Sequence, residues 1–224
     1  MSALVRSVNV GRPREAAWAE IGRTSIDKRP LGGQVRVGRL GLEGDEVSDT
    51  RHHGGPDQAV YAFAREDLDT WEARLGREIR DGQFGENLTT EGIDVNDAEI
   101  GEHWRIGTAV LEIVSMRTPC NDFRNWMGES GYDRTAWVRR FTATNRPGPY
   151  FRVLEEGVRC RATYASAATR ASSTRPSTRS SSGSRDRSVV NALNIMVTVT
   201  PWPGRRTTSI GSPAASTPSS RTRK

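Results

Sequence analysis

Residues 59–75 read AVYAFAREDLDTWEARL, and they contain the clearest change of secondary structure in the chain. Residues 59–64 form a short apolar run rich in aromatics, which is typical of a buried strand. From there on, apolar residues recur at helical spacing up to Leu75, acids occupy the first turn, and Gly76 can cap the C-terminus. The sequence therefore predicts a buried strand that runs directly into a helix over 65–75.

The residues on both sides of this stretch indicate short strands. Val35, Val37 and Leu40 alternate with polar neighbours, as in a half-buried strand. Residues 103–106 and 109–115 indicate a hairpin that turns at Gly107 and Thr108. A further strand is predicted over 150–155, and two short amphipathic helices precede it, marked by Phe123, Trp126 and Met127 and by Ala136, Trp137 and Phe141. Many short strands, Gly-rich turns and few helices predict a mainly β, barrel-like domain.

The net charge of +6 is distributed very unevenly over the 224 residues. Residues 158–224 contain 12 Lys and Arg residues against one acid, so they carry +11. Residues 1–157 contain 21 bases and 26 acids, so they carry −5. The folded part is therefore mildly acidic, and we expect no specific nucleic-acid binding by it. A basic tail that binds DNA remains a further alternative.

The segment 158–224 differs from the rest in composition as well. Of its 67 residues, 24 are Ser or Thr, and most of it offers no apolar face to bury. Such a chain cannot recover the ordering cost of about 1–2 kcal/mol per residue, so we predict a disordered tail. Only residues 189–199 are apolar enough for a strand, and the sequence shows no partner for them.

The number of cysteines and the length of the apolar runs exclude two classes of protein. Two Cys residues exclude a disulfide scaffold. The longest apolar runs, such as 109–114, are far shorter than the ~18 residues that a membrane span needs, so no membrane partner is expected. The N-terminus also lacks the layout of a signal peptide, and a cytoplasmic location is predicted.

Two glycine-containing motifs are candidates for a ligand site. Residues 51–57, RHHGGPD, lead directly into the predicted buried strand, and paired glycines allow a tight turn or a close approach to a ligand. Adjacent His side chains diverge, which argues against a zinc site formed by both. Residues 82–92, GQFGENLTTEG, include Asn87, whose amide can bind an oxyanion or a heteroaromatic edge. Both motifs are equally compatible with ordinary turns.

The candidate with the clearest chemistry is Cys120, in the run Arg117-Thr118-Pro119-Cys120 after a predicted strand. Nearby guanidinium groups lower a thiol's pKa and favour the thiolate, which is a nucleophile and a ligand for soft metals. The alternative is a small buried hydrophobic residue.

A fourth motif, residues 146–153, contains Arg146 and Arg152, which can bind an anion or serve as surface charges. The chain has no phosphate-binding glycine loop and too few His residues to favour a Ser-His-Asp triad.

Taken in order, these segments resemble the MOSC family, named for the C-terminal domain of molybdenum cofactor sulfurase. The matching stretches run from TSIDKRPLGGQVRVGRLGLEGDEVSDTRHHGGPDQAVYAF through FGENLTTEG, IGEHWRIG and RTPC to RPGPYFRVLEEG. The chain is most similar to bacterial stand-alone members associated with resistance to 6-hydroxylaminopurine. The resemblance implies a MOSC-like β-barrel domain over residues 1–157.

The resemblance also implies a molybdenum cofactor (molybdopterin) and the residues that bind it. Cys120 would be the catalytic residue and the molybdenum ligand. The positions that match the cofactor-binding motifs are Lys28, His53, Gly54, Gly55, Gly85, Asn87, Arg117 and Arg152. Related proteins reduce N-hydroxylated bases and amidoximes, so the expected substrate is a small N-hydroxylated compound.

Two further expectations concern partners and an alternative activity. Nothing in the sequence looks like a flavin or iron–sulfur site, so a separate reductase would donate the electrons, and a homodimer remains open. The alternative function is a non-enzymatic carrier that holds a persulfide on Cys120 for the sulfuration of a metallocofactor.

The likeness ends at Gly157, where relatives continue with a Gly-Asp turn and a closing strand. One hypothesis is that residues 158–224 come from a frameshift in a GC-rich gene. If the codons of Val158 to Thr163 end in G or C, reading them two bases later gives Ala-Val-Pro-Gly-Asp-Val, which restores the turn. The domain would then lack its closing strand, and Cys160 would have no role.

Overall fold

The structure, a computed structural model, describes residues 4–162 and 197–200. The strands are β1 Leu4–Val10, β2 Arg14–Glu15, β3 Arg23–Thr24, β4 Arg29–Pro30, β5 Gly33–Gly38, β6 Gly41–Leu42, β7 Val60–Ala64, β8 Leu88–Glu91, β9 His103–Ile106, β10 Ala109–Met116, β11 Pro149–Glu155, β12 Gly157–Ala162 and β13 Val197–Thr200. The helices are α1 Arg65–Leu75, α2 Asn121–Glu129 and α3 Trp137–Ala143, and a 3-10 turn spans Pro56–Gln58.

The predicted strand–helix unit is present as β7 and α1. All five residues of β7 are buried, and α1 follows it without a loop. Gly76 caps α1 in the left-handed conformation, with φ of 65°, and its N–H donates to the Glu72 carbonyl. These features depend on neighbouring residues in the chain, which is why the sequence predicts both ends of the helix.

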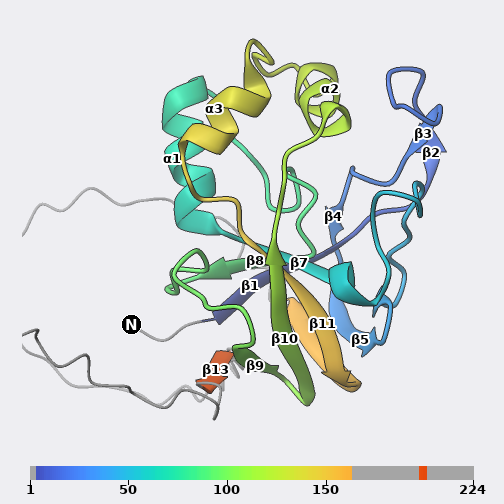
Figure 1. Cartoon of the computed structure of the whole chain (residues 1–224), viewed down its shortest axis with the longest axis vertical. Coiled ribbons are helices and arrows are strands. Elements are labelled where there is room, and N and C mark those ends of the chain that lie inside the picture. The colour runs from blue at the N-terminus through green and yellow to red at the C-terminus, as the bar shows by residue number, and fades with distance from the viewer. Residues whose placement is uncertain (1–3, 163–196, 201–224) are drawn as a thin grey trace, which may run out of the picture.

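β7 lies in the middle of the molecule because both of its faces are covered. Val60, Ala62 and Ala64 belong to the core between the strands. Tyr61 and Phe63 point the other way, into a second, aromatic core formed with the three helices. Successive side chains of a strand alternate between its two faces, so a five-residue apolar strand can serve two cores. Figure 1 shows β7 crossing between the helices at one end and most of the strands at the other.

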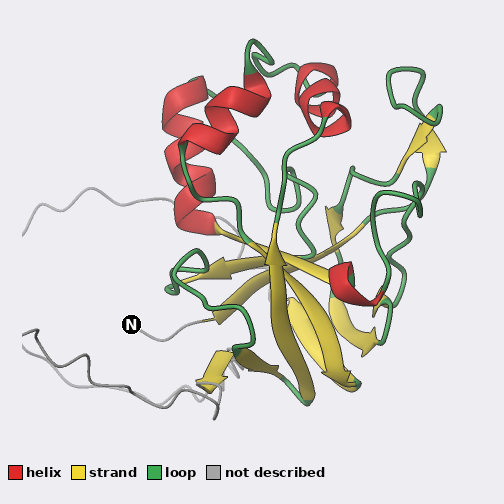
Figure 2. Cartoon of the chain, in the orientation of Figure 1, coloured by secondary structure: helices red, strands yellow, loops and turns green. Residues whose placement is uncertain are grey.

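The main sheet is mixed, with the strand order β13-β9-β10-β11-β7-β8-β1-β4. β7 pairs parallel with β8 and antiparallel with β11, and the hairpin β9–β10 turns at Gly107 and Thr108 as predicted. A smaller sheet, β12-β5-β6, packs against the main one. The mainly β fold with a few short helices is thus confirmed, and Figure 2 shows how the helices gather at one end of the sheets.

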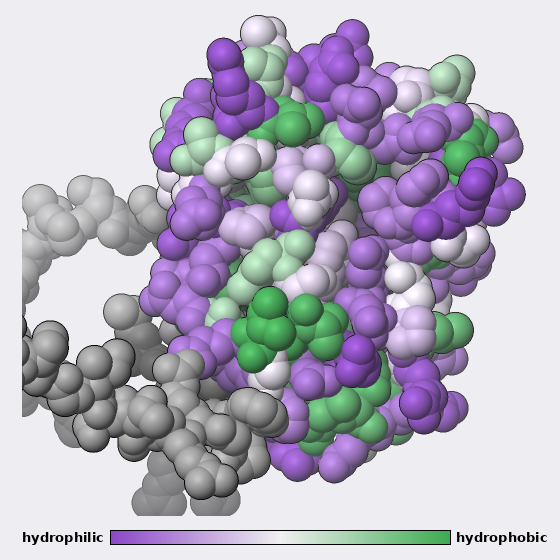
Figure 3. Space-filling model, in the orientation of Figure 1, coloured by the Kyte–Doolittle hydropathy of each residue, from purple (hydrophilic) through white to green (hydrophobic). Residues whose placement is uncertain are grey.

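The expected barrel is not closed. The main sheet ends in β4 at one edge and in β13 at the other, and no hydrogen-bonded ladder among the described residues joins those two edges or links the main sheet to the small one. Leu40, predicted to continue the strand of Val35 and Val37, is 70% exposed, because β5 ends at Gly38 and Leu40 lies in the following turn. The surface seen in Figure 3 is mostly hydrophilic, with a small hydrophobic patch over the strands.

Two short strands belong to the segment for which disorder is predicted. β12 begins at Gly157 and continues to Ala162, so it crosses the expected domain boundary and pairs antiparallel with β5. β13, at the end of the apolar run 189–199, pairs antiparallel with β9. Residues 163–196 and 201–224 lie outside the described residues, and the frameshift hypothesis stays a prediction. None of the described helices is long and apolar enough to cross a membrane.

Candidate functional site

Cys120 lies at the point where β10 gives way to α2. It is the N-cap of α2, and its sulfur accepts a hydrogen bond from the Phe123 N–H at 3.4 Å. The side chain is half-buried and lines a cavity of about 120 Å³. The positive end of the helix dipole and this N–H both favour a negative charge on the sulfur. The thiol is therefore only partly buried and is accessible from the cavity.

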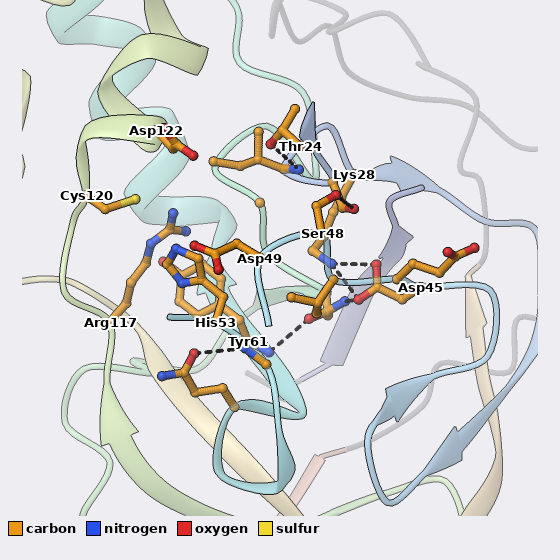
Figure 4. Close-up of a pocket in the computed structure, with 18 of the residues that line it drawn as sticks. Thr24, Lys28, Asp45, Ser48, Asp49, His53, Tyr61, Arg117, Cys120 and Asp122 are labelled. Atoms are coloured by element: carbon orange, nitrogen blue, oxygen red, sulfur yellow. Dashed lines mark hydrogen bonds and ion pairs between the residues drawn. The ribbon is translucent and has the colours of Figure 1, made fainter. Parts of the chain in front are cut away.

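Arg117 supplies the positive charge predicted beside the thiol. Its side chain is buried, its Nη1 donates to the Phe84 carbonyl, and the guanidinium lies over the rings of Tyr61 and Phe123, at 4.7 and 4.3 Å from their centroids. These contacts hold the cation in a single position near Cys120. Figure 4 shows Arg117, His53 and Cys120 together on one side of the pocket.

His53 is the second group that acts on the thiol. Burial by itself would raise the pKa of Cys120, but the neighbouring His53 imidazole and the charge of Arg117 hold that pKa below its ordinary value. The neighbouring Cys120 in turn raises the pKa of His53, against the effect of its burial. The two shifts act in the same direction, toward the thiolate form of Cys120 and the protonated form of His53.

The two adjacent His residues diverge, as predicted. His52 is exposed, and its Nδ1 lies 2.8 Å from an Asp49 carboxylate oxygen, whereas His53 lines the pocket. Within the described residues, no group of three or more His, Cys, Asp or Glu side chains is arranged to hold a metal ion.

The different positions of His52 and His53 give a direct test of the thiol's environment. At pH 7, His53→Ala should slow the alkylation of Cys120 by iodoacetamide several-fold, because loss of the imidazole raises the thiol's pKa and reduces the thiolate fraction. His52→Ala, which removes an exposed imidazole, is the matched control and should leave the rate unchanged. Equal rates in both variants would contradict the assigned role of His53.

Lys28 and Asn87 line the pocket but are already engaged by other residues. Lys28 Nζ lies 2.5 Å from both carboxylate oxygens of Asp45, and the Asn87 amide donates to the same carboxylate at 2.8 Å and to the Asn9 carbonyl at 3.3 Å. The Asn87 side-chain oxygen accepts from the Tyr61 N–H at 3.1 Å. Burial lowers the pKa of Lys28, although Asp45 opposes this shift. These contacts assign Lys28 and Asn87 to the pocket wall.

Of the three predicted glycines, Gly54 and Gly85 line the pocket and Gly55 does not. Gly54 and Gly85 have φ of 76° and 78°, in the region where only glycine is relaxed. A Cβ on Gly85 would lie 3.0 Å from Ile26 Cγ1, close to Arg117. Gly55 shares the positive φ, but it is absent from the pocket lining.

Arg152, which the resemblance places at the cofactor, does not line the Cys120 pocket. Arg152 Nε lies 2.7 Å from Asp57 Oδ1, and Nη1 lies 3.3 Å from Glu112 Oε2, on the outer face of β11. Its neighbours Phe151 and Val153 are buried. Because successive side chains of a strand point to opposite faces, the Arg152 side chain points away from the core. Arg146, the other arginine of the same motif, pairs with Asp67 and Asp94.

Sequence reasoning missed several residues that hold the site together. The Asp45 carboxylate contacts both Lys28 and Asn87, and it accepts a hydrogen bond from the Gly11 N–H at 2.7 Å. Glu86 is buried and accepts from the N–H groups of Gly82 and Phe84. Both acids lie within the motifs quoted above, but acidic residues in Gly-rich loops usually face solvent, so their burial could not be read from the sequence.

Glu86 makes the stability of the protein depend on pH. Its burial raises the pKa of the carboxyl group from 4.5 to about 7, even though its hydrogen bonds oppose this shift. Between pH 4.5 and about 7, the folded state therefore holds a proton on Glu86 that the unfolded state has released. The stabilisation of the fold by this proton is complete below pH 4.5 and is lost as the pH rises to about 7. At ~1.4 kcal/mol per pKa unit, the loss is on the order of 3 kcal/mol.

Urea unfolding of the wild type and Glu86→Gln at several pH values between 4.5 and 7.5 measures this contribution. The free energy of unfolding should fall more steeply with pH in the wild type than in the variant, whose side chain does not titrate. The absolute stability of Glu86→Gln is expected to be lower, because its amide nitrogen cannot accept an N–H bond. Parallel pH profiles would contradict the assignment.

The comparisons with known proteins identify the family. A family model for the MOSC domain matches residues 49–163, which include the whole Cys120 motif. The chain belongs to the MOSC family. Among its MOSC relatives, YflK of Bacillus subtilis is 36% identical over 154 residues, which cover 68% of this chain and 67% of that protein. YiiM of Escherichia coli is 32% identical over 116 residues, about half of each chain.

The fold of this MOSC protein is also found in solved structures. The crystal structure of YiiM from Geobacillus stearothermophilus matches with a TM-score of 0.56 and 31% identity, over 70% of each chain. A protein named reductase from Gibberella moniliformis is 30% identical over 161 residues. The match covers 69% of this chain but only 27% of that longer protein.

Proposed function

We propose that this MOSC protein binds the molybdenum cofactor in the Cys120 pocket and reduces small N-hydroxylated compounds. The observation that carries the proposal is a thiol whose pKa is lowered by His53 and Arg117 and which opens into a cavity. A thiolate suits a soft, redox-active metal, and the family and the relative named reductase support a reductive role.

The residues of the pocket fit such a cofactor at its metal end. The Cys120 thiolate would be the protein's ligand to the metal. For the anionic phosphate ester, the candidate is Arg23, exposed at the pocket, whose guanidinium makes no ion pair within the described part of the chain. Lys28 is less suitable than its sequence position indicates, because Asp45 already neutralises it.

The proposed reaction converts an N-hydroxyl group to an amine, with two electrons and two protons consumed and water released. The bound cofactor would supply the redox chemistry, with electrons from a separate reductase. The protein's own residues hold and shield the site. Arg117 and His53 favour the anionic form of the sulfur, and Tyr61 and Tyr150 line the pocket. Residues held by packing in this way give a pre-formed site.

Analysis of protein expressed with excess molybdate tests the proposal against the sulfur carrier. Near-stoichiometric molybdenum and pterin, with N-hydroxylated compounds reduced when an electron donor is added, are the expected result. A mass increase of about 32 Da on Cys120 without molybdenum would instead favour a persulfide carrier. Protein that holds neither group under these conditions would contradict both functions.

A further inference from the structure

A second cleft lies on the other side of the segment Asp27–Lys28 from the Cys120 pocket. It is formed by β2, β4, the residues after α1 and the C-terminal part of α2, and it has a volume of about 840 Å³. It shares no lining residue with the Cys120 pocket. Four arginines from three separate parts of the chain line it: Arg14, Arg29, Arg77 and Arg80.

One carboxylate serves three of these arginines. Asp27 Oδ1 lies 2.7 Å from Arg29 Nε and 2.7 Å from Arg80 Nη2, and Asp27 Oδ2 lies 3.9 Å from Arg14 Nε. One negative charge therefore faces three positive charges on this wall. Arg80 also donates to the Lys28 carbonyl, which connects this wall to the Cys120 pocket.

The opposite wall contributes a fourth cation. Arg77 donates to the carbonyls of Ser130 and Gly131, at 3.1 and 2.9 Å, and it makes no ion pair within the described residues. Glu78 and Glu129 also line the cleft, but both are exposed, and neither is paired with an arginine in the described part of the chain. Each of the four arginines, by contrast, makes a hydrogen bond, an ion pair or a ring contact.

Two of the arginines also lie against aromatic rings. The Arg14 guanidinium lies 5.3 Å from the Trp126 ring centroid, and Arg77 lies 4.8 Å from that of Tyr132. Burial and the nearby charge of Arg29 lower the pKa of Arg80, so the cations of this wall repel one another. An anion would relieve that repulsion.

We propose that this arginine cleft is a binding site for a small phosphate-bearing anion, separate from the Cys120 pocket and independent of the reaction proposed there. Guanidinium groups form paired hydrogen bonds with phosphate oxygens, and several of them converge here. The volume of the cleft has room for a ligand larger than phosphate alone. Formally, four arginines face three carboxylates, and the excess of positive charge is concentrated around Asp27.

Isothermal titration calorimetry of the full chain with inorganic pyrophosphate tests this site. We expect saturable binding with a Kd of about 1 mM or tighter. Arg29→Gln/Arg77→Gln should weaken binding by at least ~10-fold, through the loss of two charge-assisted contacts. Arg29→Gln alone, at a side chain that is 61% exposed, should weaken it by about threefold and leave the fold intact.

The matched control is Arg105→Gln/Arg139→Gln, which removes the same charge from exposed positions outside both pockets. This control and Cys120→Ser should both bind pyrophosphate like the wild type. No saturable heat at millimolar pyrophosphate, equal weakening in the two double variants, or loss of binding in Cys120→Ser would each overturn the proposal. Cys120→Ser tests molybdenum binding and not pyrophosphate binding. A failure of the anion-site proposal is therefore distinguishable from a failure of the proposed reductase function.

Discussion

Replacing Cys120 with serine is expected to remove the bound molybdenum and to lower the rate of N-hydroxyl reduction by on the order of 100-fold or more. That range is typical when a group acting directly at a reacting centre is lost. A serine hydroxyl stays protonated near neutral pH, and its harder oxygen is a poor ligand for a soft metal. Metal analysis and a reduction assay on the same preparation measure both losses.

The position of Cys120 makes this variant unusually easy to interpret. Cys120 is the N-cap of α2, where serine is among the most favoured residues, so Cys120→Ser should melt at or above the temperature of the wild type. Cys160→Ser is the thiol control and should keep both metal and activity. A Cys120→Ser protein that retains molybdenum and full activity would refute the assignment of Cys120 as the ligand.

Replacing Asp45 with alanine is expected to destabilise the protein by about 3–5 kcal/mol, the range for removing one partner of a buried ion pair. The side chains of Lys28 and Asp45 are only 11% and 7% exposed. Without Asp45, the Lys28 ammonium, the Gly11 N–H and the Asn87 amide each lose a hydrogen-bond partner. Since domains are typically stable by only ~5–15 kcal/mol, the loss should be obvious in urea unfolding.

Two comparisons separate the ion pair from a general effect of lost charge. Asp97→Ala, at an exposed carboxylate, should change the free energy of unfolding by less than ~0.5 kcal/mol. Lys28→Met/Asp45→Ala should recover part of the loss, because no unpaired cation stays buried, although Gly11 and Asn87 still lack their partner. An Asp45→Ala variant as stable as Asp97→Ala would show that the pair contributes nothing.

Local features of the chain are where the sequence predicts the fold best. The end of α1 at Gly76, the hairpin turn at Gly107 and the buried strand before α1 all depend on residues close together in the chain. The prediction for Leu40 is wrong because two valines two residues apart do not show where the strand ends. Closure of the sheet into a barrel depends on contacts between distant strands, and the main sheet of the described residues stays open.

For the site, the sequence by itself determined the chemistry available: one cysteine at a strand end with a nearby arginine, and the glycines that the family motifs require. Only the tertiary structure decided which groups act together. It brought His53 to Cys120, engaged Lys28 and Asn87 with Asp45, and directed Arg152 outward. The physical reason is that a side chain's charge state and its freedom to bind a ligand depend on burial and on neighbours distant in the chain, which a linear motif does not encode.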